Sequence, residues 1–308
     1  MRNTKKSGRH ILKTDRERFE FINKNRTLYP LRVMCRVLEI SKSGYYAWKE
    51  RPTSVRRIEN ERLLIEIRRL FHGNKSEYGS PRIWRELDAA DIACGENRVA
   101  RLMRFDKLVA LQKRKFCVTT HSKHGFPVWP NIVNRNFIIP APDKTYVSDI
   151  TYVWTMEGWL FVAVVLDLFS RGVVGLSMDE SIADSLTQAA LKQAILRRNP
   201  AQGLIFHSDR GRQYASNDFK ALLLNHKFIG SMSKKGDCWD NAVAESFFHT
   251  LKVECIRGKI FRTREEAKRT IFAWAYARYN RTRRHSTLDY LSPFEYERRY
   301  KLTLNNVH

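Results

Sequence analysis

The stretches "KTYVSDITYVWT" (residues 144–155) and "GWLFVAVVLDLFSRGVVGLSM" (residues 158–178) carry the strongest pattern in the chain. In the first, β-branched and aromatic residues recur in alternation. The second is an almost continuous apolar run with a break at residues 167–172. Short runs of this composition are typical of β-strands, and the break is typical of a turn. The two stretches therefore predict three consecutive strands.

The sequence after these strands alternates between helix and strand patterns. It predicts a helix over residues 183–199, a strand at "GLIFHS" (203–208), a helix over 216–226, a strand at "FIGSMS" (228–233) and a long helix over 241–257. The order β-β-β-α-β-α-β-α predicts an α/β fold with three layers and a mixed five-stranded sheet.

The N-terminal third is predicted to be helical. "TLYPLRVMCRVLEISKSGYYAWKE" (27–50) has a helix-turn-helix outline, with a helix over 31–38, a Ser-Lys-Ser-Gly turn and a second helix rich in aromatic residues. A long amphipathic helix is predicted over 54–71, and two further short helices within 78–108. The last of these carries an arginine stripe that we predict to contact DNA, formed by Arg98, Arg101 and Arg104.

The formal net charge of +24 is unevenly distributed along the 308 residues. Residues 1–125 hold 30 Lys and Arg against 14 Asp and Glu, residues 126–251 hold 12 against 12, and residues 252–308 hold 14 against 6. Basic flanks around a neutral middle indicate a polyanionic partner, most often nucleic acid. The sequence has no long uncharged apolar run and no signal-peptide pattern, so we expect a cytoplasmic protein that does not bind membranes.

Three acids in the middle region fall where the predicted elements can bring them together. Asp149 lies in the first strand, Asp209 follows the fourth, and Glu245 lies in the first turns of the last long helix. Carboxylates in this arrangement form an all-oxygen site for hard divalent cations, and a two-metal site of this kind catalyses in-line displacement at phosphorus. Asp237 and Asp240 are assigned to the turn before that helix, where Asp240-Asn241 is predicted to cap the helix.

Motifs from nearly the whole chain form one joint pattern: "LRVMCRVLEISKSGYYAW", "YGSPRIWREL", "SDITYVWT", "DLFSRGVVGLSM", "HSDRGRQYAS", "SMSKKGDCWDNAVAESFFHTLK" and "YNRTRRHSTLDYLSPFEYE". Together they closely resemble the transposases of the bacterial insertion-sequence-three family, specifically the product of the second reading frame. Thirty-five residues separate Asp209 from Glu245. This spacing is shared by that family and the retroviral integrases.

The resemblance implies a ribonuclease-H-like core that cleaves and joins DNA strands, with two Mg²⁺ or Mn²⁺ ions bound by Asp149, Asp209 and Glu245. It also implies a DNA contact at Lys252, seven residues after Glu245. The implied partners are the terminal inverted repeats of the transposon, target DNA, further copies of the chain on DNA and a protein from the upstream reading frame. Bound to DNA, the protein would be associated with the bacterial nucleoid.

Additional residues are predicted from their position near the acids or in basic segments. Arg210 follows Asp209 directly, and Arg283 and Arg284 lie in "RYNRTRRHSTLDYLSP", which we expect to lie along DNA. His207 can contact the acid site or be a buried, hydrogen-bonded histidine. Core or capping positions are expected for three tryptophans, Trp159, Trp239 and Trp274.

These patterns predict five segments. They are a basic extension (1–26), a helix-turn-helix-type DNA-binding region (27–108), a linker (109–136), an integrase-like catalytic core (137–262) and a basic helical C-terminal segment (263–308). Two other functions stay open: a DNA-binding regulator with a vestigial acid site, and a structure-selective nuclease that cuts DNA without joining it.

Overall fold

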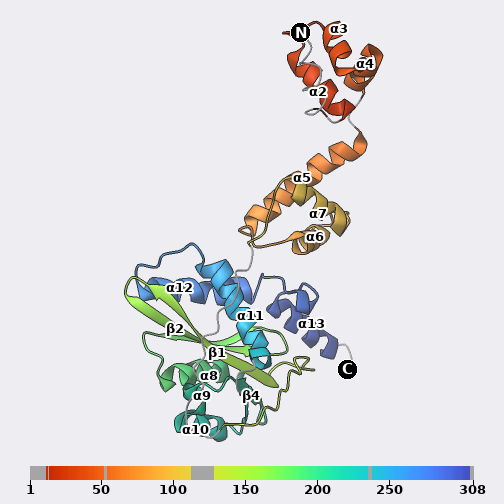
Figure 1. The fold of residues 1–308 in the computed structure, drawn as a ribbon. Coiled ribbons are helices and arrows are strands. Elements are labelled where there is room, and N and C mark those ends of the chain that lie inside the picture. Colours follow the sequence, from red (N-terminus) through yellow and green to blue (C-terminus); the bar gives the residue numbers. More distant parts are fainter. Residues whose placement is uncertain (1–11, 13, 52–53, 112–127, 235–237, 306–308) are drawn as a thin grey trace. The chain divides into compact units, whose positions relative to one another are not determined.

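The computed structural model describes residues 12, 14–51, 54–111, 128–234 and 238–305. The chain forms two compact units, residues 1–66 and 67–308, which are described separately (Figure 1). The division falls within the predicted 27–108 region. Most of the predicted linker, residues 112–127, lies outside the described residues.

The first unit is a cluster of helices, α2 (Asp15–Asn25), α3 (Leu31–Leu38), α4 (Lys42–Glu50) and the start of α5 (Val55–Gly73). Apolar side chains of the first three helices pack around Ile22, Met34, Cys35 and Tyr45. The predicted helix-turn-helix outline is confirmed. Helix α2 lies in the segment predicted as a basic extension, and a capping box between Thr14 and Glu17 starts it.

The turn between α3 and α4 lies before the predicted Ser-Lys-Ser-Gly turn at residues 41–44, which instead forms the start of α4. The chain reverses at Glu39, which adopts a left-handed backbone with φ of 56°. Ser41 is the N-cap of α4, where its hydroxyl accepts a hydrogen bond from the Gly44 backbone N–H at 2.9 Å. Serine is favoured both at helix N-caps and in turns, so a serine in the sequence is compatible with either position.

The second unit begins with the end of α5 and the predicted pair of short helices, α6 (Ser80–Asp88) and α7 (Glu96–Phe105). One face of α7 is buried through Val99, Leu102 and Met103. Arg101 and Arg104 are exposed and Arg98 is half-buried. The predicted division of α7 into a core face and an arginine face is therefore confirmed.

A mixed five-stranded sheet with the order β3-β2-β1-β4-β5 forms the centre of this unit. Its strands are β1 (Thr145–Thr155), β2 (Gly158–Asp167), β3 (Val173–Asp179), β4 (Ile205–Ser208) and β5 (Ile229–Met232). The first three are antiparallel neighbours, whereas β4 runs parallel to both β1 and β5. All five predicted strands are confirmed.

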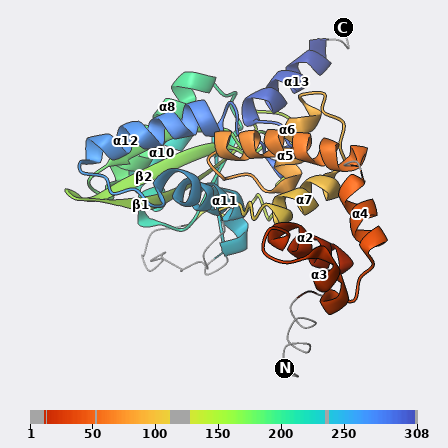
Figure 2. The ribbon, with the colours of Figure 1, turned by 90° about the horizontal axis from the view of Figure 1, so that it is seen from above.

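Helices cover both faces of the sheet, as predicted for a three-layer fold (Figures 1 and 2). One face packs against α8 (Asp184–Arg198), α9 (Arg212–Ala215) and α10 (Asn217–Asn225). The other packs against α11 (Ala242–Thr250) and α12 (Arg264–Ala273). Leading into α11 is a 3-10 turn, η1 (Cys238–Asn241). Segment 128–136, predicted as part of the linker, packs against β5 through Trp129, which lies over Gly230.

Both α11 and α12 continue as π-helices, η2 (Leu251–Ile256) and η3 (Trp274–Tyr279). The sequence predicts uninterrupted helices over 241–257 and 264–279, because apolar spacing does not distinguish one wide turn from a regular one. The chain ends in a 3-10 turn, η4 (Ser286–Leu288), and α13 (Pro293–Asn305). Within the described ranges, no helix has both the length and the apolar character needed to cross a membrane.

Close packing of β3 on α8 depends on Gly175. A Cβ atom at this position would lie 2.1 Å from the backbone oxygen of Ala190, a contact that requires the strand and helix to move apart. We expect Gly175→Ala to lower the free energy of unfolding by about 3 kcal/mol in urea denaturation. Gly73→Ala is the matched control, since nothing lies within 4 Å of the added Cβ, and it should be neutral or slightly stabilising. Equal effects of both substitutions would contradict this account.

Candidate active site

Strand pairing places Asp149 beside Asp209. The last pair in the parallel ladder between β1 and β4 is Ser148 with Ser208, so the two aspartates occupy the next position on each chain. β4 ends there, whereas β1 continues to Thr155. Asp149 therefore lies where β1 loses its parallel neighbour, at an opening in the sheet.

Glu245 comes to the same face of the sheet on α11. Val147 and Val153 flank Asp149 at two- and four-residue spacing and belong to the core beneath α11, so Asp149 faces this side. Ala244 and Phe247 anchor the first turns of α11 in the same core. The three predicted acids thus lie on β1, directly after β4 and in the first turns of α11.

The electrostatics of Asp149 indicate how closely the charged groups approach. Burial raises its pKa well above the usual value, the negative charges of Asp209 and Glu245 raise it further, and Lys252 opposes them. Burial also raises the pKa of Glu245. Each of the three acids is half-buried and in reach of solvent. Neighbouring half-buried carboxylates of this kind favour a cation between them.

Local hydrogen bonds orient the two aspartates. The backbone N–H of Ile150 donates to Asp149 Oδ1 at 2.8 Å, and the N–H of Gly211 donates to Asp209 Oδ1 at 2.9 Å. A Cβ at Gly211 would lie 2.9 Å from that carboxylate oxygen, so a larger residue there would crowd it. Both bonds leave oxygen lone pairs for a ligand.

The donor set has the chemistry that Mg²⁺ and Mn²⁺ prefer, since all three groups are carboxylates. Among the described residues, no three His, Cys, Asp or Glu side chains are gathered tightly enough to hold an ion. The two aspartates, adjacent through the β1–β4 register, are carboxylates of the kind that hold such a cation.

Lys252 lies next to this site, as its position on the helix predicts. Its Nζ atom is 5.3 Å from the centre of the Tyr152 ring. Burial lowers its pKa, and the charge of Asp149 acts in the opposite direction. The ammonium group is therefore held between an aromatic ring and the acid cluster.

Asp240 is a structural acid, but it has no part in the predicted Asp240-Asn241 cap. The N-cap of α11 is Asn241, without a side-chain capping bond. The Asp240 carboxylate is 1% exposed and accepts hydrogen bonds from Asn131 Nδ2, Arg135 Nε and the Lys234 backbone N–H. Although burial opposes its ionisation, these donors hold its pKa below the usual value. Asp240 thus ties segment 128–136 to the turn; Asp237 lies outside the described residues.

His207 is a buried, hydrogen-bonded histidine. Its ring nitrogens bond to the Ser231 hydroxyl at 2.9 Å and to the backbone oxygen of Asp240 at 3.1 Å. Burial lowers its pKa to about 4. A neutral ring with both nitrogens engaged supports the β4 and β5 ends and does not present a free base to the acids.

A hydroxyl pair behind the aspartates was not predicted from the sequence. The Tyr214 and Ser148 hydroxyls lie 2.8 Å apart in the interior. Burial raises the pKa of Tyr214, and the charges of Asp149 and Asp209 raise it further. Its only sequence signal is its place five residues after Asp209 in "HSDRGRQYAS". Arg210, predicted to contact DNA, donates from Nε to the Ser233 backbone oxygen at 2.8 Å.

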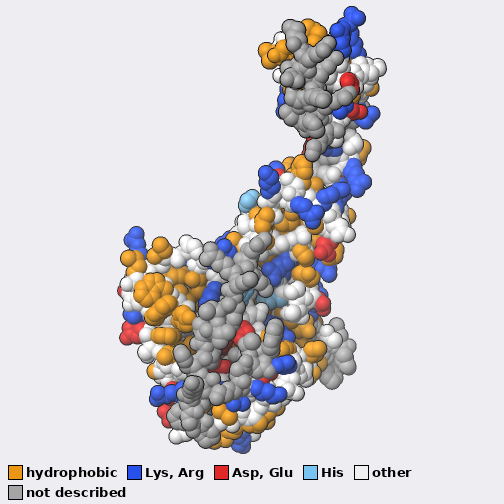
Figure 3. Space-filling model, in the orientation of Figure 1, with side chains coloured by type: hydrophobic (Ala, Val, Ile, Leu, Met, Phe, Trp, Pro, Cys, Tyr) orange, Lys and Arg blue, Asp and Glu red, His pale blue; other side chains and the backbone are white. Residues whose placement is uncertain are grey.

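Trp159 does not have the predicted core or capping role. It is 45% exposed and packs edge-on against Trp154 and Tyr152 on the β1–β2 hairpin, with ring centres 4.8 and 5.0 Å away. Hydrophobic side chains gather over this hairpin in Figure 3. Trp274 is 7% exposed and belongs to the core, as predicted. The side chain of Trp239 lies outside the described set.

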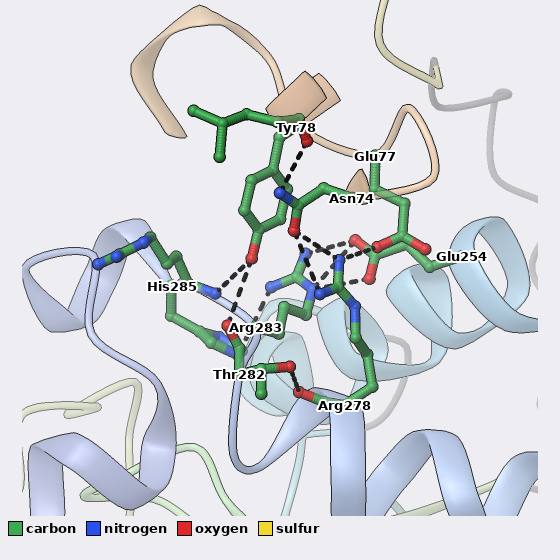
Figure 4. A network of polar contacts seen from close by, with 10 residues as sticks. Asn74, Glu77, Tyr78, Glu254, Arg278, Thr282, Arg283 and His285 are labelled. Carbon is green, nitrogen blue, oxygen red and sulfur yellow. Dashed lines mark hydrogen bonds and ion pairs between the residues drawn. The ribbon is translucent and has the colours of Figure 1, made fainter. Parts of the chain in front are cut away.

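The second basic segment, predicted to lie along DNA, turns inward at two arginines. Arg283 forks onto Glu254 with contacts of 2.8 to 3.0 Å, and both side chains are below 10% exposed. Arg284 pairs with Glu86 at 2.6 Å. Figure 4 shows Arg283 within a network that joins the segment between α5 and α6 to the C-terminal chain. The DNA contact predicted for Arg283 is corrected, because its guanidinium is buried and paired.

The buried histidine of this network, His285, predicts that the stability of the fold depends on pH. Burial, then the charges of Arg283 and Arg82, lower the pKa of His285 from 6.5 to about 2. Below pH 6.5 the unfolded chain binds a proton at His285 that the folded chain does not, so stability is full above pH 6.5 and falls below it. We expect the free energy of unfolding to drop by about 1.4 kcal/mol from His285 alone between pH 7.5 and 5.5. In urea titrations at both pH values, the free energy of unfolding of His285→Gln should fall by about 1.4 kcal/mol less than that of the wild type. The same fall in both proteins would show that His285 is not the group responsible.

Comparisons with known proteins agree with this architecture. Residues 140–238 and 229–293 match two family models described as integrase core domains, and residues 59–116 match an HTH-like domain. The chain is 41% identical over 282 residues to the transposase InsF of insertion sequence IS3A from Escherichia coli K12, covering 91% of this chain and 98% of that protein.

Two further likenesses extend the comparison. An uncharacterized 31 kDa protein of insertion element IS600 from Shigella sonnei is 41% identical over 267 residues, covering 87% of this chain and 98% of that protein. Among solved structures, a simian T-cell lymphotropic virus intasome in complex with a PP2A regulatory subunit aligns with a TM-score of 0.45 and 13% identity, over 74% of this chain and 73% of that one.

Proposed function

Because the chain belongs to the insertion-sequence transposases that include InsF of IS3 and so acts in DNA transposition, we propose that Asp149, Asp209 and Glu245 are its catalytic residues. The observation that carries the proposal is the register of β1 and β4, which sets the two aspartates side by side. The proposed reaction is strand cleavage at the element ends followed by joining to target DNA.

The proposed roles follow from the position of each group. Asp149 on β1 and Asp209 directly after β4 offer carboxylate ligands held by paired strands, while Glu245 on α11 supplies the third. Asp149, Asp209 and Glu245 would hold two Mg²⁺ or Mn²⁺ ions, which would supply charge neutralisation at the phosphate and activation of the attacking water or 3′-hydroxyl. Lys252, beside Asp149, holds a phosphate of the DNA end. The hydroxyl pair of Tyr214 and Ser148 fixes the strand segment that carries Asp149.

The remaining partners also belong to the proposal. Terminal inverted repeats and target DNA are the substrates, and several copies of the chain assemble on the ends, with a protein from the upstream reading frame as a possible partner. The exposed arginine face of α7 supports sequence reading by Arg101 and its neighbours, because a short helix that displays arginines can enter the major groove.

A strand-cleavage and strand-transfer assay tests the proposal against its two alternatives. Duplexes that carry the ends of the element are incubated with the full chain and Mg²⁺ or Mn²⁺, and both cut and joined products are measured. We expect metal-dependent cutting at the ends and joined product. End binding without any cutting would identify a regulator, and cutting without joining would identify a nuclease.

The arginine face gives a separate prediction. If Arg101 reads a base, Arg101→Ala should lower the discrimination between the cognate end and scrambled DNA by about 1 to 3 kcal/mol at one salt concentration. Lys107→Ala, which removes an exposed cation just after α7, is the control and should weaken both DNAs alike. A uniform loss for Arg101→Ala would make it a phosphate contact instead.

A further inference from the structure

The polar network before α6 lines part of a pocket of about 210 Å³. Its wall includes Ser246, His249 and Thr250 from α11, and the basic side chains Arg82 and Arg283. Ser246 follows Glu245 directly, and Thr250 lies about 7.5 Å further along the helix axis than Glu245 at about 1.5 Å per residue. The pocket therefore opens along the same helix that carries the proposed catalytic glutamate.

The charges around this pocket do not balance. Arg278 pairs with Glu77 at 2.7 Å, and Arg283 pairs with Glu254 at 2.8 Å, so each of these acids is already neutralised (Figure 4). Among the described residues, no carboxylate lies within ion-pair distance of Arg82. His285 adds no charge, because burial and the neighbouring arginines keep it neutral. One positive charge, on Arg82, is left over.

The position of Arg82 is fixed although it has no ion-pair partner. It lies in the first turn of α6, which is anchored by the buried side chains of Ile83 and Leu87. Its guanidinium stacks over the Tyr78 ring at 5.3 Å, and the Tyr78 hydroxyl accepts a hydrogen bond from the Arg284 backbone N–H at 2.9 Å. Burial, and then the charge of Arg283, lower the pKa of Arg82. A half-buried cation held in this way is stabilised by an anion that enters the pocket.

We propose that this pocket binds one backbone phosphate of the DNA strand that lies next to the acid site, with Arg82 as the charged ligand and hydroxyl groups of the pocket wall as hydrogen-bond donors. Ser246, Ser286 and Thr287 supply these hydroxyls, whereas the Thr250 hydroxyl already donates to the Ser246 backbone oxygen at 2.9 Å. The inference rests on the proposed function, since it takes DNA as the substrate beside Glu245. It assigns a positioning role to α6, which would hold the strand in register with the catalytic acids.

Binding of the full chain to DNA ends in EDTA tests this proposal without any catalysis. The probes are duplexes with the end of the element in which one phosphate at a time is replaced by an uncharged methylphosphonate. For the wild type, one position near the cleavage site should lower the affinity. For Arg82→Gln, the affinity for unmodified DNA should already be lower and the same replacement should have no further effect, with the salt slope reduced by about 0.9.

Matched variants separate this role from a general one. Arg82→Lys keeps the charge and should keep most of the affinity and the position-specific response. Arg85→Gln, on the same helix but outside the pocket wall, should leave the position-specific response intact. Additive losses for Arg82→Gln and every methylphosphonate would overturn the proposal. So would Arg82-dependent binding of millimolar inorganic phosphate that does not compete with DNA, because the pocket would then serve free phosphate.

Thermal unfolding distinguishes DNA binding by Arg82 from a purely structural role of this residue. Since Arg82 has no ion-pair partner among the described residues, Arg82→Gln should unfold within about 3 °C of the wild type or above it. A clearly lower midpoint together with unchanged DNA binding would make Arg82 a structural residue. The proposed function fails independently if the wild type does not cleave DNA with metal, whereas the EDTA binding result concerns Arg82 alone.

Discussion

Asp149→Asn, Asp209→Asn and Glu245→Gln are each expected to lower strand cleavage by about a thousandfold or more, while binding to DNA ends stays within a few-fold of the wild type. The reason is that each change removes one charged metal ligand and keeps the shape of the side chain, and metal ligation contributes several kcal/mol to such reactions. The amides of the two Asn variants can still accept the bonds from Ile150 and Gly211. Cleavage rates in Mg²⁺ and equilibrium binding in EDTA are the measurements.

Two acids outside the cluster are the controls for this series. Asp218→Asn changes an exposed residue on α10 and should leave cleavage unchanged. Asp240→Asn removes the charge that faces Arg135 and should lower stability while keeping cleavage at temperatures where the protein is folded. If folded Asp240→Asn did not cleave DNA and Glu245→Gln did, Asp240 and not Glu245 would be the catalytic acid.

The largest expected effect on stability comes from Glu254. Glu254→Gln leaves the Arg283 guanidinium buried without a counter-charge, and breaking a buried pair from one side typically costs about 3 to 5 kcal/mol. Urea denaturation at pH 7.5 measures the loss. Glu265→Gln is the matched control, since its pair with Arg269 is well exposed and should contribute less than about 0.5 kcal/mol. Similar losses in both variants would show that burial of the pair is not what matters.

A double variant checks the physical cause. Replacing both partners with apolar residues, Arg283→Met with Glu254→Leu, removes the uncompensated charge and should recover most of the stability that Glu254→Gln loses. A double variant that is as unstable as Glu254→Gln would point to lost packing around Tyr279, whose ring lies 5.8 Å from Arg283, as the main effect.

The sheet and the acid cluster could be predicted from the sequence because each depends on local patterns. Alternating and continuous apolar runs define β1 to β3, and Asp149 and Asp209 lie at strand positions that the ladder makes adjacent. Trp159 could not be placed in this way. Period-two alternation assigns it to one face of β2, but only the extent of the covering helices decides whether that face is exposed.

The network around Arg283 shows a second limit of sequence patterns. A cluster of arginines after a helix has the same composition whether it lies along DNA or forms ion pairs inside the protein. Arg283 and Glu254 are 29 residues apart, and Arg284 and Glu86 are 198 apart. Long-range pairs of this kind leave no periodic signal in one sequence. The capping role of Asp240 fails for the same reason, because its partner Arg135 lies 105 residues away.

Iron-directed cleavage of the polypeptide tests the central claim most directly. Fe²⁺ replaces Mg²⁺ in the full chain bound to a DNA end, ascorbate and peroxide generate hydroxyl radicals at the ion, and the sites of backbone scission are identified by mass spectrometry. We predict scission close to Asp149, Asp209 and Glu245, abolished by excess Mg²⁺ and reduced in Asp209→Asn. Scission elsewhere in the chain, with these three positions intact, would contradict the assignment of the metal site.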